Sequence, residues 1–249
     1  MSNYELPLSG KPFPNQFLMS DFSPILLGVT GYAGSGKDTV ANMLREKLLL
    51  RVIPRPSMVT RESYARPIKE AYLAKWGTVL NFTYEDMDDF EWKKQRNPFT
   101  GTTHRQELQF DGTEGTRVRT NNPDVWVQHL WARNRLKNGV LVVSDTRFGN
   151  EVNFTSQHGV LIKVNRPGQE TISTSSHESE VICPDGASNF VVINDGSKED
   201  LRAKVQSLVD TVFSSDFKDL FRGVSTTSEI QKEAKEIVLS GRPRYFQEV

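Results

Sequence analysis

The sequence predicts a three-layer α/β domain built around a parallel β-sheet. Apolar runs alternate along the chain with amphipathic helical patterns, and a glycine-rich turn joins the first apolar run, 24–29, to the first helical pattern. The near-continuous apolar run 140–143 is typical of a parallel strand that is buried on both faces. At 249 residues, the chain has the length of one such domain with insertions.

Composition narrows the class of protein. Lysine plus arginine and aspartate plus glutamate number 31 each, so the formal net charge is zero and no overall field attracts nucleic acid or an anionic membrane. The single cysteine, Cys183, excludes internal disulfides and suits a reducing cytoplasm. No apolar run approaches the length of a membrane span. We therefore expect a cytoplasmic protein whose partners are neither nucleic acids nor membranes.

The turn after the first apolar run has the pattern of a phosphate-binding loop. Gly31 and Gly36, followed by Lys37, match G-x-x-x-x-G-K-[ST] except at the last position, where Asp38 precedes Thr39. Glycines let the backbone curl its N–H groups around phosphates, and the following helix adds its positive end. A dinucleotide-binding fingerprint fits worse, because Thr39 stands where a third glycine or alanine is needed. A turn without a ligand is the remaining alternative.

The loop predicts contacts to a nucleotide and its metal. We expect phosphates to contact Gly31, Ala33, Gly34, Ser35, Gly36, Lys37, Asp38 and Thr39. Thr39 carries a hydroxyl that can reach the phosphates or Mg²⁺, and the Asp38 carboxylate can approach the metal or its waters.

Two elements are expected soon after the loop. Val40, Leu44 and Leu48 fall at helical spacing, which predicts a helix that packs on the sheet. A short second strand is expected to start at 52–53, before the proline-rich stretch that follows.

The next helix is expected to start around Pro67 and to end at Gly77. Arg66 and Lys69 lie at its N-terminal end, where the helix dipole disfavours cations. A bound anion is one interpretation, and two solvated basic residues are the other. Residues 81–103 are charged and aromatic with weak periodicity, which favours a solvated, mobile insertion over a carboxylate metal cluster.

The following helices carry candidate ligands. Arg105 and Gln109 are four residues apart, so they share a helix face on which a guanidinium can hold a phosphate and an amide a base edge. Gly112 is expected to end that helix. Another helix is expected to start at Asn122, as its cap, and to place Trp126 in the core or in a pocket wall.

The last part of the chain predicts strands at 140–144, 160–164 and 190–193, a helix that starts at Ser197, and a final helix near 230–241. Asp145 follows a buried strand, which in a phosphate-loop protein is the usual position for organising Mg²⁺. Arg147 beside it is a candidate phosphate ligand or carboxylate clamp. The alternative is that Asp145 caps a helix and Arg147 lies on the surface.

Six blocks of sequence occur in an order that resembles the deoxynucleoside monophosphate kinases of tailed bacteriophages. They are GSGKDT at 34–39, ARPIK at 65–69, the segment 105–117, SDTRFGNE at 144–151, NRPG at 165–168 and NDGS at 194–197. The resemblance covers most of 28–212 and leaves out both arms and 81–103. Within that family, the Lys-Asp-Thr ending of the loop is expected.

The resemblance implies the nucleoside monophosphate kinase branch of the P-loop NTPase fold. The expected parts are an N-terminal arm at 1–23, a kinase domain at 24–212 and a C-terminal helix and tail at 213–249. Within the kinase domain we expect a monophosphate-binding region at about 60–120 and a lid at about 166–185. Homodimer formation, and a host cytoplasm if the protein is phage-encoded, are expectations at the level of the family.

The resemblance also implies roles for individual residues. Lys69, Arg105 and Arg117 would receive the acceptor phosphate, Gln109 and Trp126 would contact the base, Arg147 and Glu151 would form a paired site group, and Arg166 would be a lid cation. The catalytic set is then Lys37, Asp38, Asp145, Arg147 and Arg166, with Mg²⁺ organised by Thr39, Asp38 or Asp145. From its position alone, at the root of the polar loop that follows, Arg166 could close on phosphates during transfer, and the alternative is a simple turn arginine.

The resulting hypothesis is phosphoryl transfer from ATP to a deoxynucleoside monophosphate, assisted by Mg²⁺. One rival is a P-loop kinase with another phosphorylated acceptor, of the dephospho-coenzyme A or phosphomevalonate type. A second rival is a nucleotide-dependent switch or ATPase. A guanine switch needs an Asn-Lys-x-Asp base reader, which the sequence lacks, and a motor needs an acidic residue after Asp145, where Thr146 stands.

Overall fold

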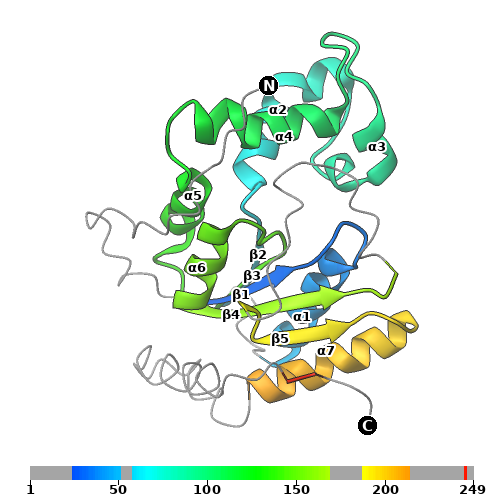
Figure 1. Cartoon of the computed structure of the whole chain (residues 1–249), viewed down its shortest axis with the longest axis vertical. Coiled ribbons are helices and arrows are strands. Elements are labelled where there is room, and N and C mark those ends of the chain that lie inside the picture. The colour runs from blue at the N-terminus through cyan, green and yellow to red at the C-terminus, as the bar shows by residue number, and fades with distance from the viewer. Residues whose placement is uncertain (1–23, 52–57, 169–186, 214–243, 246–249) are drawn as a thin grey trace.

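The computed structural model describes residues 24–51, 58–168, 187–213 and 244–245. The elements in chain order are β1 (Ile25–Thr30), α1 (Lys37–Arg51), β2 (Val59–Glu62), α2 (Arg66–Leu80), η3 (Asp86–Asp88), α3 (Phe90–Lys94), α4 (His104–Gly112), η4 (Glu114–Val118), α5 (Val125–Asn134), β3 (Val140–Val143), α6 (Gly149–His158), β4 (Gly159–Asn165), β5 (Phe190–Ile193), α7 (Lys198–Val212) and β6 (Arg244–Tyr245). Figure 1 shows how they are arranged.

The strands form one sheet in the order β2-β3-β1-β4-β5-β6, and every neighbouring pair is parallel. The central strand β1 pairs on both sides, so that Leu27 lies beside Val142 of β3 and Val160 of β4. This confirms the predicted parallel α/β sheet. Because β2 and β4 lie on opposite sides of β1, the loop that follows β1 opens where the strand order reverses, which is where ligands bind in such sheets.

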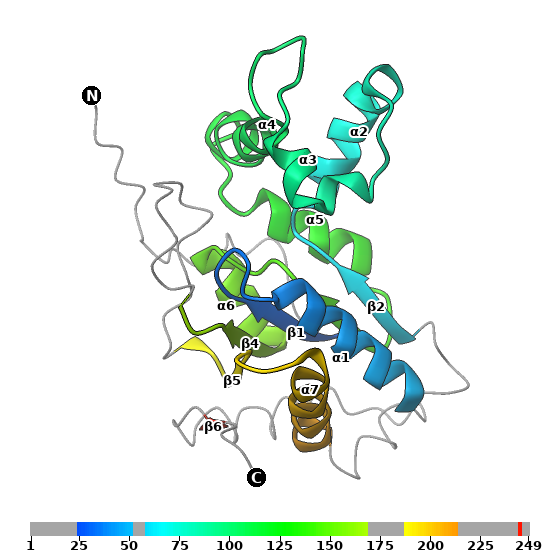
Figure 2. The same ribbon diagram turned by 90° about the vertical axis from the view of Figure 1, so that its right-hand side faces the viewer.

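Helices cover both faces of the sheet, which makes three layers. Helices α1 and α7 pack together under one face, around a core that includes Leu48, Val205 and Leu208. Helices α5 and α6 cover the other face, around a second core that includes Leu130 and Phe154. Figure 2 shows α1 and α7 on the opposite side of the sheet from α6. No helix in the described ranges is both long and apolar enough to cross a membrane.

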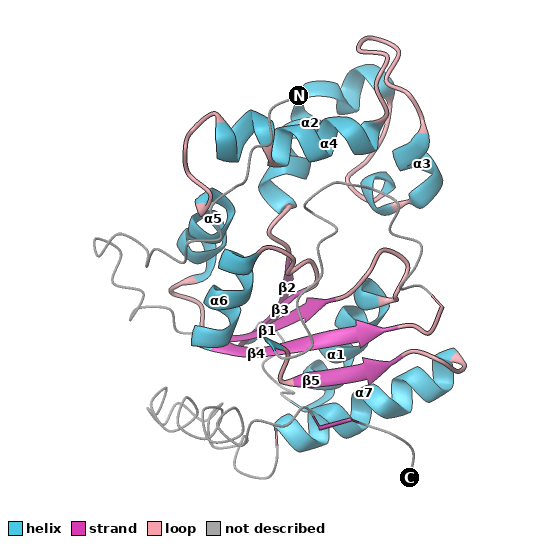
Figure 3. Ribbon diagram, viewed as in Figure 1, coloured by secondary structure: helices cyan, strands magenta, loops and turns pink. Residues whose placement is uncertain are grey.

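A helical module rises beyond the carboxyl ends of the strands. It consists of α2, η3, α3, α4 and η4, and Figure 3 shows only helices and loops in this part. Its core is a third cluster in which Tyr72, Phe82 and Met87 are buried. The Trp92 ring stacks on His104 with the ring centres 4.1 Å apart, and the Tyr72 hydroxyl lies 2.8 Å from His104 Nδ1.

The expectation of a solvated insertion at 81–103 is therefore wrong for Phe82, Met87 and Trp92, whereas Phe90 and Phe99 are exposed. Phe82, Met87 and Trp92 recur without helical period because they come from a turn and two very short helices, yet they pack on α2 and α4. The acidic residues cap these turns instead of gathering around a metal: Asp89 accepts the Trp92 N–H at 2.7 Å, and Asp86 accepts the Thr83 N–H at 2.7 Å.

Two predicted helix boundaries are also wrong. Helix α2 continues through Gly77 to Leu80 and ends with Asn81 in the left-handed region at φ 53°. Gly77 is buried within the helix, and a Cβ there would lie 2.6 Å from Leu73 Cδ1, the end of a flexible side chain. Helix α5 begins at Val125 with Asp124 before it, and Asn122 accepts the Asp124 N–H at 3.1 Å in the preceding turn.

Several predictions concern residues outside the described ranges: the arm at 1–23, the strand start at 52–53, most of the lid and the helix near 230–241. The second strand that the structure does describe, β2, lies further on, at Val59–Glu62.

Candidate functional site

The loop between β1 and α1 is curled in a way that only glycine permits. Gly34 and Gly36 have φ values of 79° and 92°, which L side chains rarely adopt. A Cβ at Gly31 would lie 2.5 Å from the Val164 carbonyl oxygen, and one at Gly36 would lie 2.6 Å from Asn194 Nδ2. The predicted phosphate-loop geometry is therefore present, with the N-terminus of α1 directly behind it.

Asn194 holds this loop from the end of β5. Its side-chain N–H donates to the Ser35 carbonyl oxygen at 2.9 Å, and Ser35 itself is fully buried. In the sequence, Asn194 belongs to the NDGS block at 194–197, for which no contact was predicted. Its structural role depends on strand order, because β5 reaches the loop only through its place beside β4.

Lys37 is a nearly buried cation at the base of the loop, with 9% of its surface exposed. Burial lowers the pKa of its ammonium group, and the nearby charge of Arg147 lowers it further, whereas Asp38 and Asp145 raise it. A cation that is poorly solvated and lies near a second cation is stabilised by an incoming anion. Lys37 and Arg147 thus favour phosphate binding at this position.

Asp38 is already engaged by a cation that sequence reasoning missed. The Arg61 guanidinium on β2 donates to the Asp38 carboxylate at 2.8 Å, and the same guanidinium reaches Asn42 at 2.9 Å and the Ser144 hydroxyl at 3.2 Å. No sequence pattern singles out Arg61, because its role depends on β2 lying beside β3. Lys37 lies 3.9 Å from the same carboxylate.

Asp145 fastens the start of the helical module to the sheet. Its two carboxylate oxygens accept the backbone N–H groups of Tyr64 at 2.8 Å and Ala65 at 2.9 Å. These residues connect β2 to α2. Asp145 therefore links the loop edge to the base of the module, and any contribution to a metal would come in addition to these bonds.

The described residues supply no protein-only metal site, since they contain no group of three or more His, Cys, Asp or Glu side chains around a common point. Asp38 and Asp145 are bound by Arg61 and by backbone amides, respectively. Thr39 in the first turn of α1 is a suitable hydroxyl ligand. This donor set fits Mg²⁺ only if phosphate oxygens complete its coordination, which is the usual mode of this ion in nucleotide sites.

Glu151 and Arg117 form a buried ion pair at 2.6 Å between α6 and η4. The Arg117 guanidinium lies 3.6 Å from the centre of the Phe148 ring. The other Glu151 oxygen accepts the backbone N–H groups of Arg147 and Phe148, so the predicted link to Arg147 runs through its main chain. Burial raises the pKa of Glu151, and the Arg117 charge and the two amides oppose that rise. Only 2% of the Glu151 surface is exposed, so its carboxylate is closed off from solvent and serves to orient the Arg117 guanidinium.

Arg105 and Gln109 both lie on α4, as predicted, and Thr103 caps this helix with a reciprocal bond pair to Gln106. Trp126 packs in the core between α5 and the sheet with 7% of its surface exposed. Its indole N–H donates to the Gly112 carbonyl oxygen at 2.8 Å. The predicted contact with a base could therefore use only the face or edge of the ring and not the N–H group.

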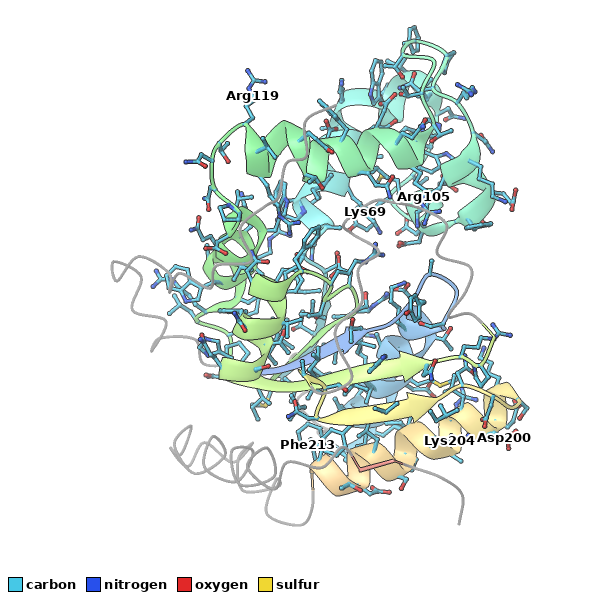
Figure 4. The ribbon with its side chains drawn as sticks, viewed as in Figure 1. Lys69, Arg105, Arg119, Asp200, Lys204 and Phe213 are labelled. Atoms are coloured by element: carbon cyan, nitrogen blue, oxygen red, sulfur yellow. The ribbon has the colours of Figure 1, made fainter. Side chains whose placement is uncertain are left out.

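Lys69 and Arg105 lie on the side of the module that faces the sheet, as Figure 4 shows. The Lys69 ammonium group pairs with the Asp88 carboxylate at 2.5 Å and lies 5.4 Å from the centre of the Tyr84 ring. Arg166 is exposed just after β4, and the remainder of the predicted lid lies outside the described ranges. The site thus has two cationic parts, one in the loop and one in the module.

Comparison with known proteins adds little to this geometry. No family model and no curated protein sequence matches the chain. Among solved structures, the chain is similar to the crystal structure of APE1195, with 17% identity, a TM-score of 0.36, and coverage of 78% of this chain and 98% of that one. It is also similar to the shikimate kinase from Acinetobacter baumannii in complex with shikimate, with 15% identity, a TM-score of 0.32, and coverage of 90% and 98%. At these TM-scores the fold assignment rests on the strand order and the glycine loop, which together define an α/β P-loop fold.

Proposed function

We propose that the protein transfers the terminal phosphoryl group of ATP to the phosphate of a deoxynucleoside 5′-monophosphate, giving ADP and the deoxynucleoside diphosphate. The observation that carries the proposal is the division of the site into two cationic parts. Lys37 and Arg147 lie at the loop, and Lys69 and Arg105 lie on the facing side of the module. A reaction between two phosphates needs one anion site on each side of the moving group.

The chemistry requires positioning and positive charge. An oxygen of the acceptor phosphate bonds to the terminal phosphorus of ATP, and the bond from that phosphorus to the bridging oxygen breaks, which leaves ADP. Because both reactants are anions, stabilisation of the crowded charge is the main task. Lys37 and the loop amides would bind the donor phosphates, and Arg147 and Arg166 would approach the transferred group.

The acceptor side rests on the resemblance together with the chemistry of the residues present. Lys69, Arg105 and Arg117 would bind the monophosphate. Arg117 suits this role because its buried Nε has no hydrogen-bond partner within the described residues, while Glu151 holds its terminal nitrogen. Gln109 and the Trp126 ring would contact the base.

Mg²⁺ would enter with ATP and be held by Thr39 and, through water, by Asp38 or Asp145. When bound, it would supply positive charge that offsets the negative charge of the phosphates.

Product identification with a panel of acceptors tests the proposal. Purified protein would be mixed with Mg-ATP and, separately, with each common deoxynucleoside monophosphate, with dephospho-coenzyme A and with phosphomevalonate. We expect ADP and one deoxynucleoside diphosphate in equal amounts. Transfer only to one of the other two acceptors, or ATP hydrolysis at the same rate without any acceptor, would overturn the proposal.

A further inference from the structure

Lys93 on α3 is a cation that belongs to neither predicted group of site residues. Its ammonium group donates to the backbone carbonyl of Asp88 at 3.3 Å. The carboxylate of the same residue pairs with the Lys69 ammonium group at 2.5 Å. Asp88 therefore holds two lysines at once, Lys93 through its main chain and Lys69 through its side chain.

The charges around Lys93 come from both parts of the site. Its pKa is lowered, first by burial and then by the charge of Lys69, with Arg105 acting in the same direction. Asp88 and Asp38 oppose this shift. Lys93 thus lies within electrostatic range of the module cations and of the loop residue Asp38.

The loop experiences the same charge from its side. Lys93 is among the groups that lower the pKa of Lys37. Figures 1 and 2 agree with this arrangement, since both place α3 on the side of the module above the loop that leads into α1. The charge of Lys93 therefore acts on both parts of the proposed site.

We propose that Asp88 is a built-in counterion of the acceptor site, which an incoming phosphate displaces from Lys69 so that Lys69 and Lys93 become ligands of that phosphate. The assignment of the anion as an acceptor phosphate rests on the proposed function. The exposures of the two side chains support the exchange. The Asp88 side chain is 57% exposed, so water solvates its carboxylate once it is released, whereas Lys69 is 14% exposed and needs a new anion.

The same short helix supplies matched controls. Glu91 and Lys94 form an exposed pair at 2.8 Å, with side chains 74% and 54% exposed. Glu91→Gln removes the same charge as Asp88→Asn, and Lys94→Met removes the same charge as Lys93→Met. The controls therefore separate the specific contact from the general effect of net charge on anion binding.

The test measures binding of inorganic phosphate and of a deoxynucleoside monophosphate by titration calorimetry, with thermal unfolding as a check on folding. Loss of the competing Asp88–Lys69 ion pair in Asp88→Asn should tighten binding of both anions by about two- to fivefold. Lys93→Met should weaken it by about tenfold, the direction expected for loss of a charged phosphate contact. Glu91→Gln and Lys94→Met should stay within about twofold of the wild type.

An affinity of Asp88→Asn equal to or below that of Glu91→Gln would overturn the inference, and so would a Lys93→Met variant that binds like Lys94→Met. Inorganic phosphate binding requires no transfer. Tighter phosphate binding by Asp88→Asn in a protein that phosphorylates no monophosphate would therefore preserve the counterion and reject the proposed reaction. Transfer with unchanged phosphate binding would do the reverse.

Discussion

The phosphate-binding loop and the helical module are held in place in different ways. The loop is shaped by its own glycines, whose conformations and close approaches leave no room for side chains. The module depends on contacts between distant residues, such as Tyr72 with His104 and Phe82 with Trp92. The backbone of the loop is thus shaped mainly by its own glycines and held by contacts from β4 and β5, whereas the module depends on the packing of several short elements.

The largest expected effect comes from removing the cation of the phosphate-binding loop. Lys37→Ala should reduce phosphoryl transfer by about 10³-fold or more, because it removes the loop cation from the crowded phosphates. The fold should be retained, because burial disfavours the charged ammonium group in the free protein and its removal therefore takes away little stability. Steady-state kinetics and circular dichroism measure both effects. Arg45→Ala, which changes an exposed residue of α1, is the control and should leave turnover unchanged.

The next effect tests whether the module depends on its core. Met87 is fully buried in the module, and Met87→Ala should lower the free energy of unfolding by about 3 kcal/mol. The KM for the acceptor should rise while the affinity for ATP changes little. Val79→Ala, at a position on α2 that is 61% exposed, should change stability by less than about 0.5 kcal/mol. Equal losses of ATP and acceptor binding in Met87→Ala would contradict the separation of the two parts.

A substitution in the loop should weaken ATP binding and leave acceptor binding little changed. Gly36→Ala places a Cβ 2.6 Å from Asn194 Nδ2 at a φ of 92°, which should cost about 2 kcal/mol and weaken ATP binding. Gly149→Ala is the matched control, because a Cβ there meets nothing within 4 Å. Calorimetric titration of ATP compares the two variants. Unimpaired ATP binding by Gly36→Ala would show that the loop tolerates a side chain.

The smallest expected effect concerns the sheet region away from the site. Burial lowers the pKa of His158 to about 4, below the usual value of 6.5. Between these values the unfolded chain binds more protons than the native protein, so stability should fall as the pH is lowered through 6.5 toward 4. His158→Gln should reduce this loss of unfolding free energy at low pH by about 1 kcal/mol. His129→Gln, at an exposed position, should not reduce it. Thermal unfolding between pH 4 and 7 measures the difference.

The sequence predicted the features whose cause is local. Gly31, Gly36 and Lys37 identify the loop because their spacing reflects backbone geometry, and the run 140–143 identifies a buried strand because both of its faces are covered. Arg105 and Gln109 could be placed on one helix from their spacing alone.

The remaining features depend on topology. Arg61 and Asn194 reach the loop only because β2 and β5 occupy particular positions in the sheet. Phe82 and Met87 showed no helical period, so their burial could not be predicted. Asp145 stood out at the end of a strand, but its bonds to the β2–α2 connection required knowledge of which strands are neighbours.

A crystal structure with a bisubstrate analogue, in which adenosine is joined to a deoxynucleoside through a chain of phosphates, tests the central claim most directly. The two-part site predicts phosphates on the loop beside Lys37 at one end and beside Lys69 and Arg105 at the other. An analogue bound with its deoxynucleoside end away from the module, or with the loop left empty, would contradict it.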